Sequence, residues 1–424
     1  MDFKNYLVPG KTGLLIGIGG VSMSPLAEVL HDAGLDIRGS DMAESSNTLT
    51  LREHGIPIHI GHSADNVTDD ISFVIRTAAV HDDNPEVHEA HRRGIPVFER
   101  TQAWGALMRG YQNALCISGT HGKTTTTSMC THIMMAAEKD PTVMIGGTLP
   151  LLKACHRVGK GNTIIMESCE YYNSFLALNP TIAVVLNIEA DHLDFFKDLE
   201  DIKHSFRCFA ERVPAETGTV IANYDDANTM DALRGIARKV ITFGLNTKAD
   251  VYAQNIVHRG SVSEFDIYHR GNYFARVTLH VPGIHNVRNA LAATAAAIVL
   301  GVSPNAVKYG LAGFEGAGRR FDYKGKFQGA DLYDDYAHHP SELRALLDAV
   351  DTLNYQRSIV VFQPHTYSRT AKLFNDFVEQ LRRPTIVYLA EIYAAREKNT
   401  IGISSADLAA QIPGAKFYPT FAEI

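Results

Sequence analysis

The sequence predicts an α/β protein that consists of three successive domains. Short apolar segments alternate with helical ones along most of its 424 residues, which is typical of parallel sheets covered by helices. Glycine-rich turns follow two of the apolar segments, as they do where a strand passes into a ligand-binding helix. A chain of this length is also too long for one hydrophobic core. We place the domains at residues 1–112, 113–320 and 321–424.

Composition narrows the range of functions. The chain is 45% hydrophobic and 21% charged, as in ordinary globular proteins, and its net charge is −7. This charge argues against nucleic acid and anionic membranes as partners. The sequence has no visible signal peptide and no apolar stretch of the roughly 18 residues that span a bilayer. Its five cysteines form no CxxC pair. We therefore expect a cytoplasmic protein with reduced thiols.

The first domain opens with a strand that runs into a glycine loop. Gly17, Gly19 and Ser22 imitate the GxGxxG dinucleotide fingerprint, and Asp41 ends the next strand, where a ribose hydroxyl could bind. Because Ser22 replaces the third glycine, the loop indicates a nucleotide diphosphate without identifying it. An NAD-dependent dehydrogenase is an alternative, although it leaves the second glycine loop unused. The expected strands cover residues 14–18, 36–39, 73–77 and 96–98, with a helix at 25–32.

The second domain begins with a phosphate loop, GTHGKTTTT at residues 119–127. Backbone N–H groups of such a turn cradle phosphate oxygens, Lys123 reaches the outer phosphates, and the Thr124 hydroxyl can ligate Mg²⁺. The first glycine stands three residues before Gly122 rather than five, so the spacing departs from the common GxxxxGK[ST]. Each consecutive threonine would cost up to about 0.7 kcal/mol relative to alanine in a helix, so another feature favours them. We expect mononucleotide phosphate binding here.

Acidic residues follow two further strands of this domain. Glu167 ends one of them, at a sheet edge where carboxylates face bound ligands. Glu189, Asp191 and His192 follow the other, and hard oxygen donors beside an imidazole indicate a second metal site. The expected strands cover residues 115–118, 163–166 and 182–186, with antiparallel hairpins between 250 and 281 and helices at 119–137 and 286–300.

The third domain follows flexible glycines at residues 316–318 and alternates again. Near its end, Thr420 and Glu423 have the spacing of a capping box, which predicts another helix. The sequence stops one residue later, so we expect a truncated domain with an uncovered sheet edge and apolar surface that favour aggregation. The expected strands cover residues 332–336, 359–362, 386–389 and 416–418, with helices at 341–352 and 371–381.

The ordered motifs resemble those of the Mur ligase family over essentially the whole chain. The resemblance implies a Rossmann-like N-terminal domain for UDP-N-acetylmuramate, a central P-loop ATPase domain, and a Rossmann-like C-terminal domain for the amino acid. The motifs are GIGG at 17–20, GSD at 39–41, GTHGKTTTT at 119–127, ESCEY at 167–171, NIEADHLD at 187–194, GIHNVRNA at 283–290, GRRF at 318–321, DDYAHHP at 334–340 and FQPHTYSRT at 362–370.

The resemblance also implies a reaction. The lactyl carboxylate of UDP-N-acetylmuramate would attack the γ-phosphate of ATP to give an acyl phosphate. The amine of L-alanine would then attack the carbonyl carbon and release phosphate. ATP and Mg²⁺ are the implied cofactors. A recycling ligase that adds a tripeptide to the same sugar is one alternative, and a nucleotide-binding regulator without activity is another. The oligomeric state stays open.

Site residues carry over at the positions that match the family motifs. Lys123 would neutralise the transferring phosphoryl group, and Arg320 would reach the phosphates from the domain hinge. His285, Asn286 and Asn289 match the stretch that meets adenine and ribose, although they also suit a helix start. The implied catalytic set is Lys123, Glu167, His192, Arg320, His338 and Arg369; the ATP set is Gly119, Thr120, His121, Gly122, Lys123, Thr124, Thr125, His285, Asn286 and Asn289; the UDP-sugar set is Gly17, Gly19, Gly20, Ser22, Ser40 and Asp41; the amino-acid set is Tyr336, His338, His339 and Arg369; and the metal set is Thr124, Glu167 and His192.

Two positions depart from the family pattern. Ser22 stands where relatives have glycine, so the pyrophosphate loop could be reshaped. Thr366 stands where some relatives have arginine, which leaves Arg369 as the only arginine of that turn. Some relatives also use a carbamylated lysine, whereas Lys203 is expected to be an ordinary residue of a surface helix.

Overall fold

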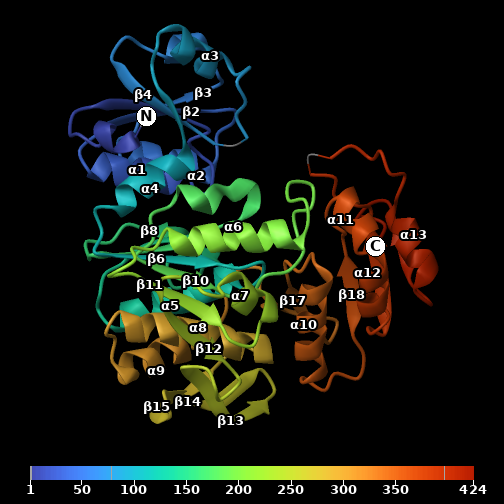
Figure 1. Ribbon diagram of the computed structural model, residues 1–424. Coiled ribbons are helices and arrows are strands. Elements are labelled where there is room, and N and C mark those ends of the chain that lie inside the picture. The colour runs from blue at the N-terminus through green and yellow to red at the C-terminus, as the bar shows by residue number, and fades with distance from the viewer. Residues whose placement is uncertain (1, 78, 396) are drawn as a thin grey trace.

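The computed structural model describes residues 2–77, 79–395 and 397–424, and its elements confirm the α/β class predicted from the sequence. Figure 1 shows three lobes in chain order, the N-terminal one in blue, the central one in green and yellow, and the C-terminal one in orange and red. Among the described helices, none is both long and apolar enough to cross a membrane.

The N-terminal lobe is a five-stranded parallel sheet with helices packed on it. Its elements are η1 (Phe3–Tyr6), β1 (Thr12–Ile16), α1 (Ser24–Asp32), β2 (Asp36–Asp41), α2 (Ser46–Glu53), β3 (Ile58–Ile60), η2 (Ala64–Asn66), β4 (Ile71–Arg76), α3 (Pro85–Arg92), β5 (Val97–Glu99) and α4 (Arg100–Met108). The strand order is β3-β2-β1-β4-β5, so the order reverses at β1. A ligand crevice forms at such a switch point, and the glycine loop follows β1 directly.

The central lobe is built on one ten-stranded sheet in the order β15-β14-β13-β12-β11-β10-β6-β9-β7-β8. Its elements are β6 (Asn113–Ser118), α5 (Lys123–Ala136), β7 (Thr142–Leu149), β8 (Ala154–Arg157), β9 (Thr163–Glu167), η3 (Tyr171–Ala177), β10 (Ile182–Val185), α6 (Leu199–Glu211), β11 (Thr219–Asn223), α7 (Ala227–Ala232), β12 (Lys239–Gly244), β13 (Val251–Arg259), β14 (Val262–His269), β15 (Asn272–Leu279), α8 (Ile284–Val299) and α9 (Pro304–Ala312). The predicted hairpins are confirmed, because β13, β14 and β15 pair antiparallel and extend the parallel strands.

The phosphate loop joins β6 to α5. Gly119 has φ 145° and Gly122 has φ 83°, conformations that side chains rarely adopt, so the turn requires both glycines. The threonines that follow are buried where α5 packs against α8 and α9. The Thr127 hydroxyl donates to the Lys123 carbonyl oxygen at 2.8 Å. Part of the threonine run therefore serves the packing and hydrogen bonding of α5 itself.

The C-terminal lobe has a three-stranded parallel sheet, β18-β19-β20, and a separate hairpin, β16-β17. Its elements are β16 (Asp322–Phe327), β17 (Ala330–Asp334), α10 (Pro340–Asp351), β18 (Ile359–Phe362), α11 (Tyr367–Lys372), α12 (Phe374–Leu381), β19 (Ile386–Ala390), α13 (Ser405–Gln411) and β20 (Lys416–Tyr418).

Three expectations for this lobe are met only in part. The strand expected at residues 332–336 forms as β17, but it pairs antiparallel with β16 outside the parallel sheet, and its side chains stay largely exposed. The helix expected at 371–381 is two helices that meet at Leu373, whose φ of −105° is not helical. The capping box at Thr420 forms only a turn. Because Phe421 is 61% exposed, no packed apolar face supports a helix there.

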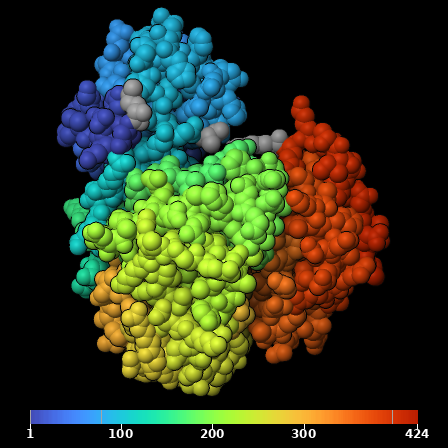
Figure 2. All heavy atoms as spheres, in the orientation of Figure 1, coloured from blue at the N-terminus to red at the C-terminus, as the bar shows by residue number. Residues whose placement is uncertain are grey.

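The N-terminal and central lobes share an apolar core, whereas the C-terminal lobe has its own. One cluster of buried side chains runs from Phe3 and Trp104 in the N-terminal lobe to Phe175 and Phe206 in the central lobe. The core of the C-terminal lobe, around Phe377, is a separate cluster. Figure 2 shows the darker orange and red residues as a distinct mass that lies against the central lobe. The C-terminal lobe therefore does not share a core with its neighbour.

Gly310→Ala should destabilise the central lobe, although alanine favours a helix over glycine by about 1 kcal/mol. A Cβ at Gly310 in α9 would lie 2.5 Å from Ile133 Cα in α5, and backbone cannot yield as a flexible side chain can. We expect a net loss of about 1–3 kcal/mol, measured as a lower melting temperature in calorimetry. Gly313→Ala is the matched control, because its Cβ would meet nothing closer than 3.4 Å. Equal melting temperatures of the two variants would show that close packing of α5 and α9 does not require Gly310.

Candidate functional site

Lys123 begins α5, and its ammonium group is enclosed by the phosphate loop. Nζ donates to the carbonyl oxygens of Gly119 and Thr120 at 2.6 and 3.1 Å, and lies 3.0 Å from Glu170 Oε2. The side chains of Lys123 and Glu170 are only 14% and 3% exposed. Burial alone would lower the pKa of Lys123, but the Glu170 carboxylate outweighs it and raises that pKa. The lysine is therefore a fixed cation at the mouth of the loop.

Thr124 and Glu167 lie against two consecutive glycines of β7. A Cβ at Gly146 would overlap the Glu167 carboxylate, and a Cβ at Gly147 would lie 3.4 Å from Thr124 Cγ2. The Gly146 N–H donates to Glu167 Oε2 at 2.7 Å and orients this carboxylate. A hydroxyl and a carboxylate are hard oxygen donors, so this pair fits Mg²⁺.

His192 follows β10 in a left-handed backbone conformation, with φ 51°. Its ring stacks on Tyr171 with ring centroids 4.3 Å apart. Its Nε2 lies 3.9 Å from Glu170 Oε1 and 3.8 Å from Asp191 Oδ2. The imidazole therefore stands between two carboxylates, one of which holds Lys123.

Arg369 reaches from α11 to the central lobe. Its Nη2 and Nε donate to Asp191 Oδ1 at 2.8 and 3.1 Å, and Nη1 lies 3.0 Å from His365 Nδ1. Burial opposes ionisation of Asp191, but His192 and Arg369 outweigh it and lower the pKa of this carboxyl. Thr366, which precedes α11, has φ 68°, a strained value for a β-branched residue.

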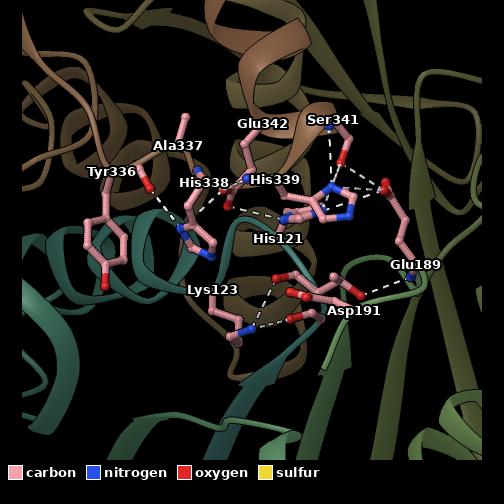
Figure 3. Close-up of polar contacts among 12 residues, drawn as sticks. His121, Lys123, Glu189, Asp191, Tyr336, Ala337, His338, His339, Ser341 and Glu342 are labelled. Atoms are coloured by element: carbon pink, nitrogen blue, oxygen red, sulfur yellow. Dashed lines mark hydrogen bonds and ion pairs between the residues drawn. The ribbon is translucent and has the colours of Figure 1, made fainter. Parts of the chain in front are cut away.

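A second polar contact joins the phosphate loop to α10 (Figure 3). His121 Nδ1 lies 3.1 Å from Glu342 Oε1, and His121 Nε2 lies 2.9 Å from the Ser341 hydroxyl. That hydroxyl also donates to Glu189 Oε2 at 2.8 Å. Burial opposes protonation of His121, but Glu189 and Glu342 outweigh it and raise its pKa to about 9. His121 is therefore a cation at pH 7.

A cavity beside these groups has a volume of about 550 Å³, which is in the range of small-ligand sites. It lies between the phosphate loop, the start of α8, and α10. Burial lowers the pKa of His285 to about 4, so that its ring is neutral at the cavity wall. The cavity collects several predicted nucleotide residues: His121, Gly122, Thr124, Thr125, His285, Asn286, Asn289 and Arg320.

Tyr336 and His338 lie on the loop between β17 and α10, as Figure 3 shows. The Arg319 guanidinium lies 4.6 Å from the centroid of the Tyr336 ring. His338 Nδ1 donates to the Tyr336 carbonyl oxygen at 2.8 Å. Burial lowers the pKa of His338, which leaves a neutral ring with Nε2 as the acceptor. Arg320 lies 4.0 Å from Glu342 at the same seam.

The N-terminal glycine loop is held by its own lobe. The Gly19 N–H donates to Asp41 Oδ2 at 2.8 Å, so Asp41 orients this loop. The Ser40 hydroxyl is buried and donates to Glu86 Oε2 at 2.8 Å. Ser22 accepts a hydrogen bond from Arg100 at its hydroxyl. Gly17 has φ 76°, and Gly20 donates its N–H to the Gly17 carbonyl oxygen. The glycines and Ser22 lie in the loop after β1, Ser40 and Asp41 end the neighbouring strand β2, and the phosphate loop belongs to a different lobe.

Reasoning from sequence missed the partners of the site residues. Glu170 was part of a motif but was given no role, although it holds Lys123. Asp191 was considered only as a metal donor, whereas it pairs with Arg369. Ser341 and Glu342 were read as a helix start. Glu342 is indeed part of a capping box with His339, so one carboxylate serves both α10 and His121. Lys203 lies in α6 and pairs with Glu200 and Asp231.

Comparison with known proteins matches most of the chain. Models of the Mur ligase family match as "catalytic domain" at residues 15–112, "middle domain" at 117–297 and "glutamate ligase domain" at 319–424. The UDP-N-acetylmuramate–L-alanine ligase of Agathobacter rectalis is 46% identical over 414 residues, 96% of this chain and 90% of that protein.

Solved structures agree with these matches. The UDP-N-acetylmuramate–alanine ligase of Thermotoga maritima has a TM-score of 0.78 at 30% identity, over 96% of this chain and 90% of that one. The UDP-N-acetylmuramate:L-alanyl-γ-D-glutamyl-meso-diaminopimelate ligase of Neisseria meningitides has a TM-score of 0.66 at 26% identity, over 72% of this chain and 99% of that one. With its motifs, fold and relatives in agreement, the chain belongs to the Mur ligase family.

Proposed function

We propose that the chain uses ATP to join L-alanine to the lactyl carboxylate of UDP-N-acetylmuramate. The observation that carries this proposal is the buried series of charges from Lys123 to Arg369, which links a phosphate loop to the C-terminal lobe. Its relatives at 43–46% identity bear the name of this ligase. Localisation in the cytoplasm agrees with the five free cysteines.

ATP would occupy the cavity between the phosphate loop and α8. The fixed cation of Lys123 suits the γ-phosphate, and the neutral ring of His285 with Asn286 and Asn289 suits the base and ribose. Thr124 and Glu167 would hold Mg²⁺ on the phosphates, and His192 with Glu170 offers donors for another ion. Magnesium, when bound, neutralises charge on the phosphates. Arg320 would approach the phosphates from the C-terminal side.

The sugar nucleotide would bind at the N-terminal switch point, where Gly17, Gly19, Gly20 and Ser22 form the loop after β1. Attack by the lactyl carboxylate oxygen on the γ-phosphorus forms an O–P bond and releases ADP. The amine nitrogen then attacks the acyl carbon and forms a C–N bond, the bond between that carbon and the bridging oxygen breaks, and inorganic phosphate leaves with this oxygen. Neutral His338 could accept the proton that the amine loses, and Tyr336, His339 and Arg369 surround that place.

The amino-acid substrate distinguishes this function from tripeptide ligation. Similarity favours L-alanine, because the tripeptide ligase of Neisseria meningitides shares 26% identity with the chain and the alanine ligase of Agathobacter rectalis shares 46%. We expect ADP release to require UDP-N-acetylmuramate and L-alanine together. Coupled assays that offer L-alanine and the tripeptide side by side test this. Faster turnover with the tripeptide, or ADP release without the sugar nucleotide, would contradict the proposal.

Lys123→Ala should lower ligation by at least roughly a hundredfold, as loss of a group that stabilises transition-state charge does. Because this variant leaves the Glu170 carboxylate buried without its cation, Lys123→Ala/Glu170→Gln is the partner variant that removes the unpaired charge. Both should bind UDP-N-acetylmuramate normally in calorimetry, since that site lies in another lobe. Ligation within tenfold of the parent rate in either folded variant would refute the assignment of the phosphate loop.

Arg369→Lys should raise KM for L-alanine more than KM for ATP, because lysine cannot reproduce the two-nitrogen contact to Asp191 and a substrate carboxylate. We expect roughly a tenfold rise in KM, the cost of about one hydrogen bond to a charged group. Steady-state kinetics with each substrate varied in turn measure this. Arg383→Lys is the control, because Arg383 follows α12 and pairs with Asp348 and Asp351 rather than with Asp191. A larger rise in KM for ATP than for L-alanine would contradict this prediction and indicate that Arg369 contacts the nucleotide.

A further inference from the structure

Three side chains with metal-binding chemistry converge where the central and C-terminal lobes meet. One ligand atom from each of His121, Glu189 and His339 lies within 4.8 Å of the other two, the only such group of three among the described residues. His121 Nε2 and Glu189 Oε2 are 3.5 Å apart, and Glu189 Oε2 and His339 Nδ1 are 3.9 Å apart. Ligand atoms around a tetrahedral Zn²⁺ are about 3.4 Å apart, given bonds near 2.1 Å. The two distances to Glu189 are therefore near those of a tetrahedral site, and the two histidine nitrogens lie within 4.8 Å of each other.

A carboxylate orients His121 in the way that metal sites require. Glu342 Oε1 lies 3.1 Å from His121 Nδ1 and accepts its N–H, so that Nε2 faces Glu189 and Ser341. Metal-binding histidines commonly donate their other ring N–H to a carboxylate, which fixes the tautomer. Figure 3 shows Glu342 on one side of the His121 ring, and Ser341 and Glu189 beyond the other nitrogen.

His339 also has the tautomer that metal binding through Nδ1 requires. Its Nδ1 accepts the backbone N–H of Ser341, so the proton of the neutral ring resides on Nε2. This Nε2 is buried and has no hydrogen-bond partner, and the residue is 6% exposed. A capping role alone does not explain why a ring with an unsatisfied N–H stands here, since asparagine or serine would cap the helix without it. The single Nδ1 lone pair is shared between the Ser341 backbone N–H, at 3.3 Å, and the Ser341 hydroxyl, at 2.6 Å, so an ion bound at Nδ1 would replace these two contacts.

The Ser341 hydroxyl fills the hollow between the three ligands. Its Oγ lies 2.9 Å from His121 Nε2, 2.8 Å from Glu189 Oε2 and 2.6 Å from His339 Nδ1. The protonated His121 donates its Nε2–H to this oxygen, and the one hydroxyl proton serves either the Glu189 carboxylate or His339 Nδ1 but not both. A divalent cation that displaced the His121 Nε2 proton would contact all three side chains, and another staggered χ1 rotamer would move Oγ aside.

We propose that His121, Glu189 and His339 form a binding site for a late first-row divalent cation such as Zn²⁺, with water as the remaining ligand. Two imidazole nitrogens disfavour Mg²⁺, so this site differs in ion and in residues from the Thr124, Glu167 and His192 set. His121 belongs to the phosphate loop and His339 to the C-terminal lobe. A bound ion would therefore pin the two lobes together. The site does not depend on the proposed ligase reaction.

The test uses Co²⁺ as a spectroscopic substitute for Zn²⁺ on the full chain, without nucleotide. One equivalent of Co²⁺ should give visible d–d bands of a tetrahedral N/O site, without the near-ultraviolet band of thiolate ligation, and Zn²⁺ but not Mg²⁺ should abolish them. His339→Asn keeps a capping side chain and Glu189→Gln keeps the shape of the carboxylate, and each should remove the bands. Glu342→Gln should weaken binding by roughly 10–100-fold, as loss of an orienting partner does.

His59→Ala, on a strand of the N-terminal lobe, is the matched control and should bind Co²⁺ like the parent chain. Melting of each variant without metal shows that it is folded. The proposal is overturned if Co²⁺ stays octahedral at one equivalent, if thiolate bands dominate, or if folded His339→Asn and Glu189→Gln retain the parent spectrum.

Discussion

The buried ammonium of Lys123 is the group on which the site depends. A desolvated cation costs several kcal/mol unless a partner of opposite charge lies beside it. Glu170, at 3.0 Å, provides that partner and is fixed in turn beside His192, at 3.9 Å. His192 lies 3.8 Å from Asp191, and Asp191 pairs with Arg369 at 2.8 Å. One series of ion pairs and close polar contacts therefore runs from the phosphate loop through His192 to the C-terminal lobe.

Through this series, a ligand bound in one lobe can change the electrostatic contacts of another lobe. An anionic phosphate at Lys123 would compete with Glu170 for the same ammonium group. If its ion pair with Lys123 weakens, the Glu170 carboxylate interacts more strongly with His192 or with a cation bound near His192. The resulting change in charge reaches Asp191, whose contact with Arg369 spans the seam. Because the pairs are buried, such changes are screened less than they would be at the surface.

The parts of this molecule that were predictable are the local ones. Apolar segments and glycine turns located β1, β6 and α5 to within a few residues, because those signals lie within one stretch of chain. Where the structure differs from the prediction, tertiary packing is the reason. β17 has the pattern of a sheet strand but pairs only with β16. The segment at Thr420 lacks an apolar face that would support a helix. The partners in the site were invisible because they are distant in sequence. Lys123 and Glu170 are 47 residues apart, Asp191 and Arg369 are 178 apart, and His121 and Glu342 are 221 apart.

The two interfaces between the lobes differ in kind, one apolar and one polar, and this difference determines at which of them the lobes can separate. Gly105 in α4 lies against the Ala177 carbonyl so closely that a Cβ would overlap it, and a continuous apolar core surrounds this contact. The C-terminal lobe has its own core and meets the phosphate loop through ion pairs and hydrogen bonds. Strained backbone also flanks that seam, at His192 beside Asp191 and at Thr366 before the helix of Arg369. Strain of this kind costs of order 1–3 kcal/mol and persists only while neighbours hold it. Separation of the lobes would free both residues to relax, whereas separating the N-terminal lobe would expose a shared core. Domain movement is therefore expected at the polar seam, where the charges of the site already lie.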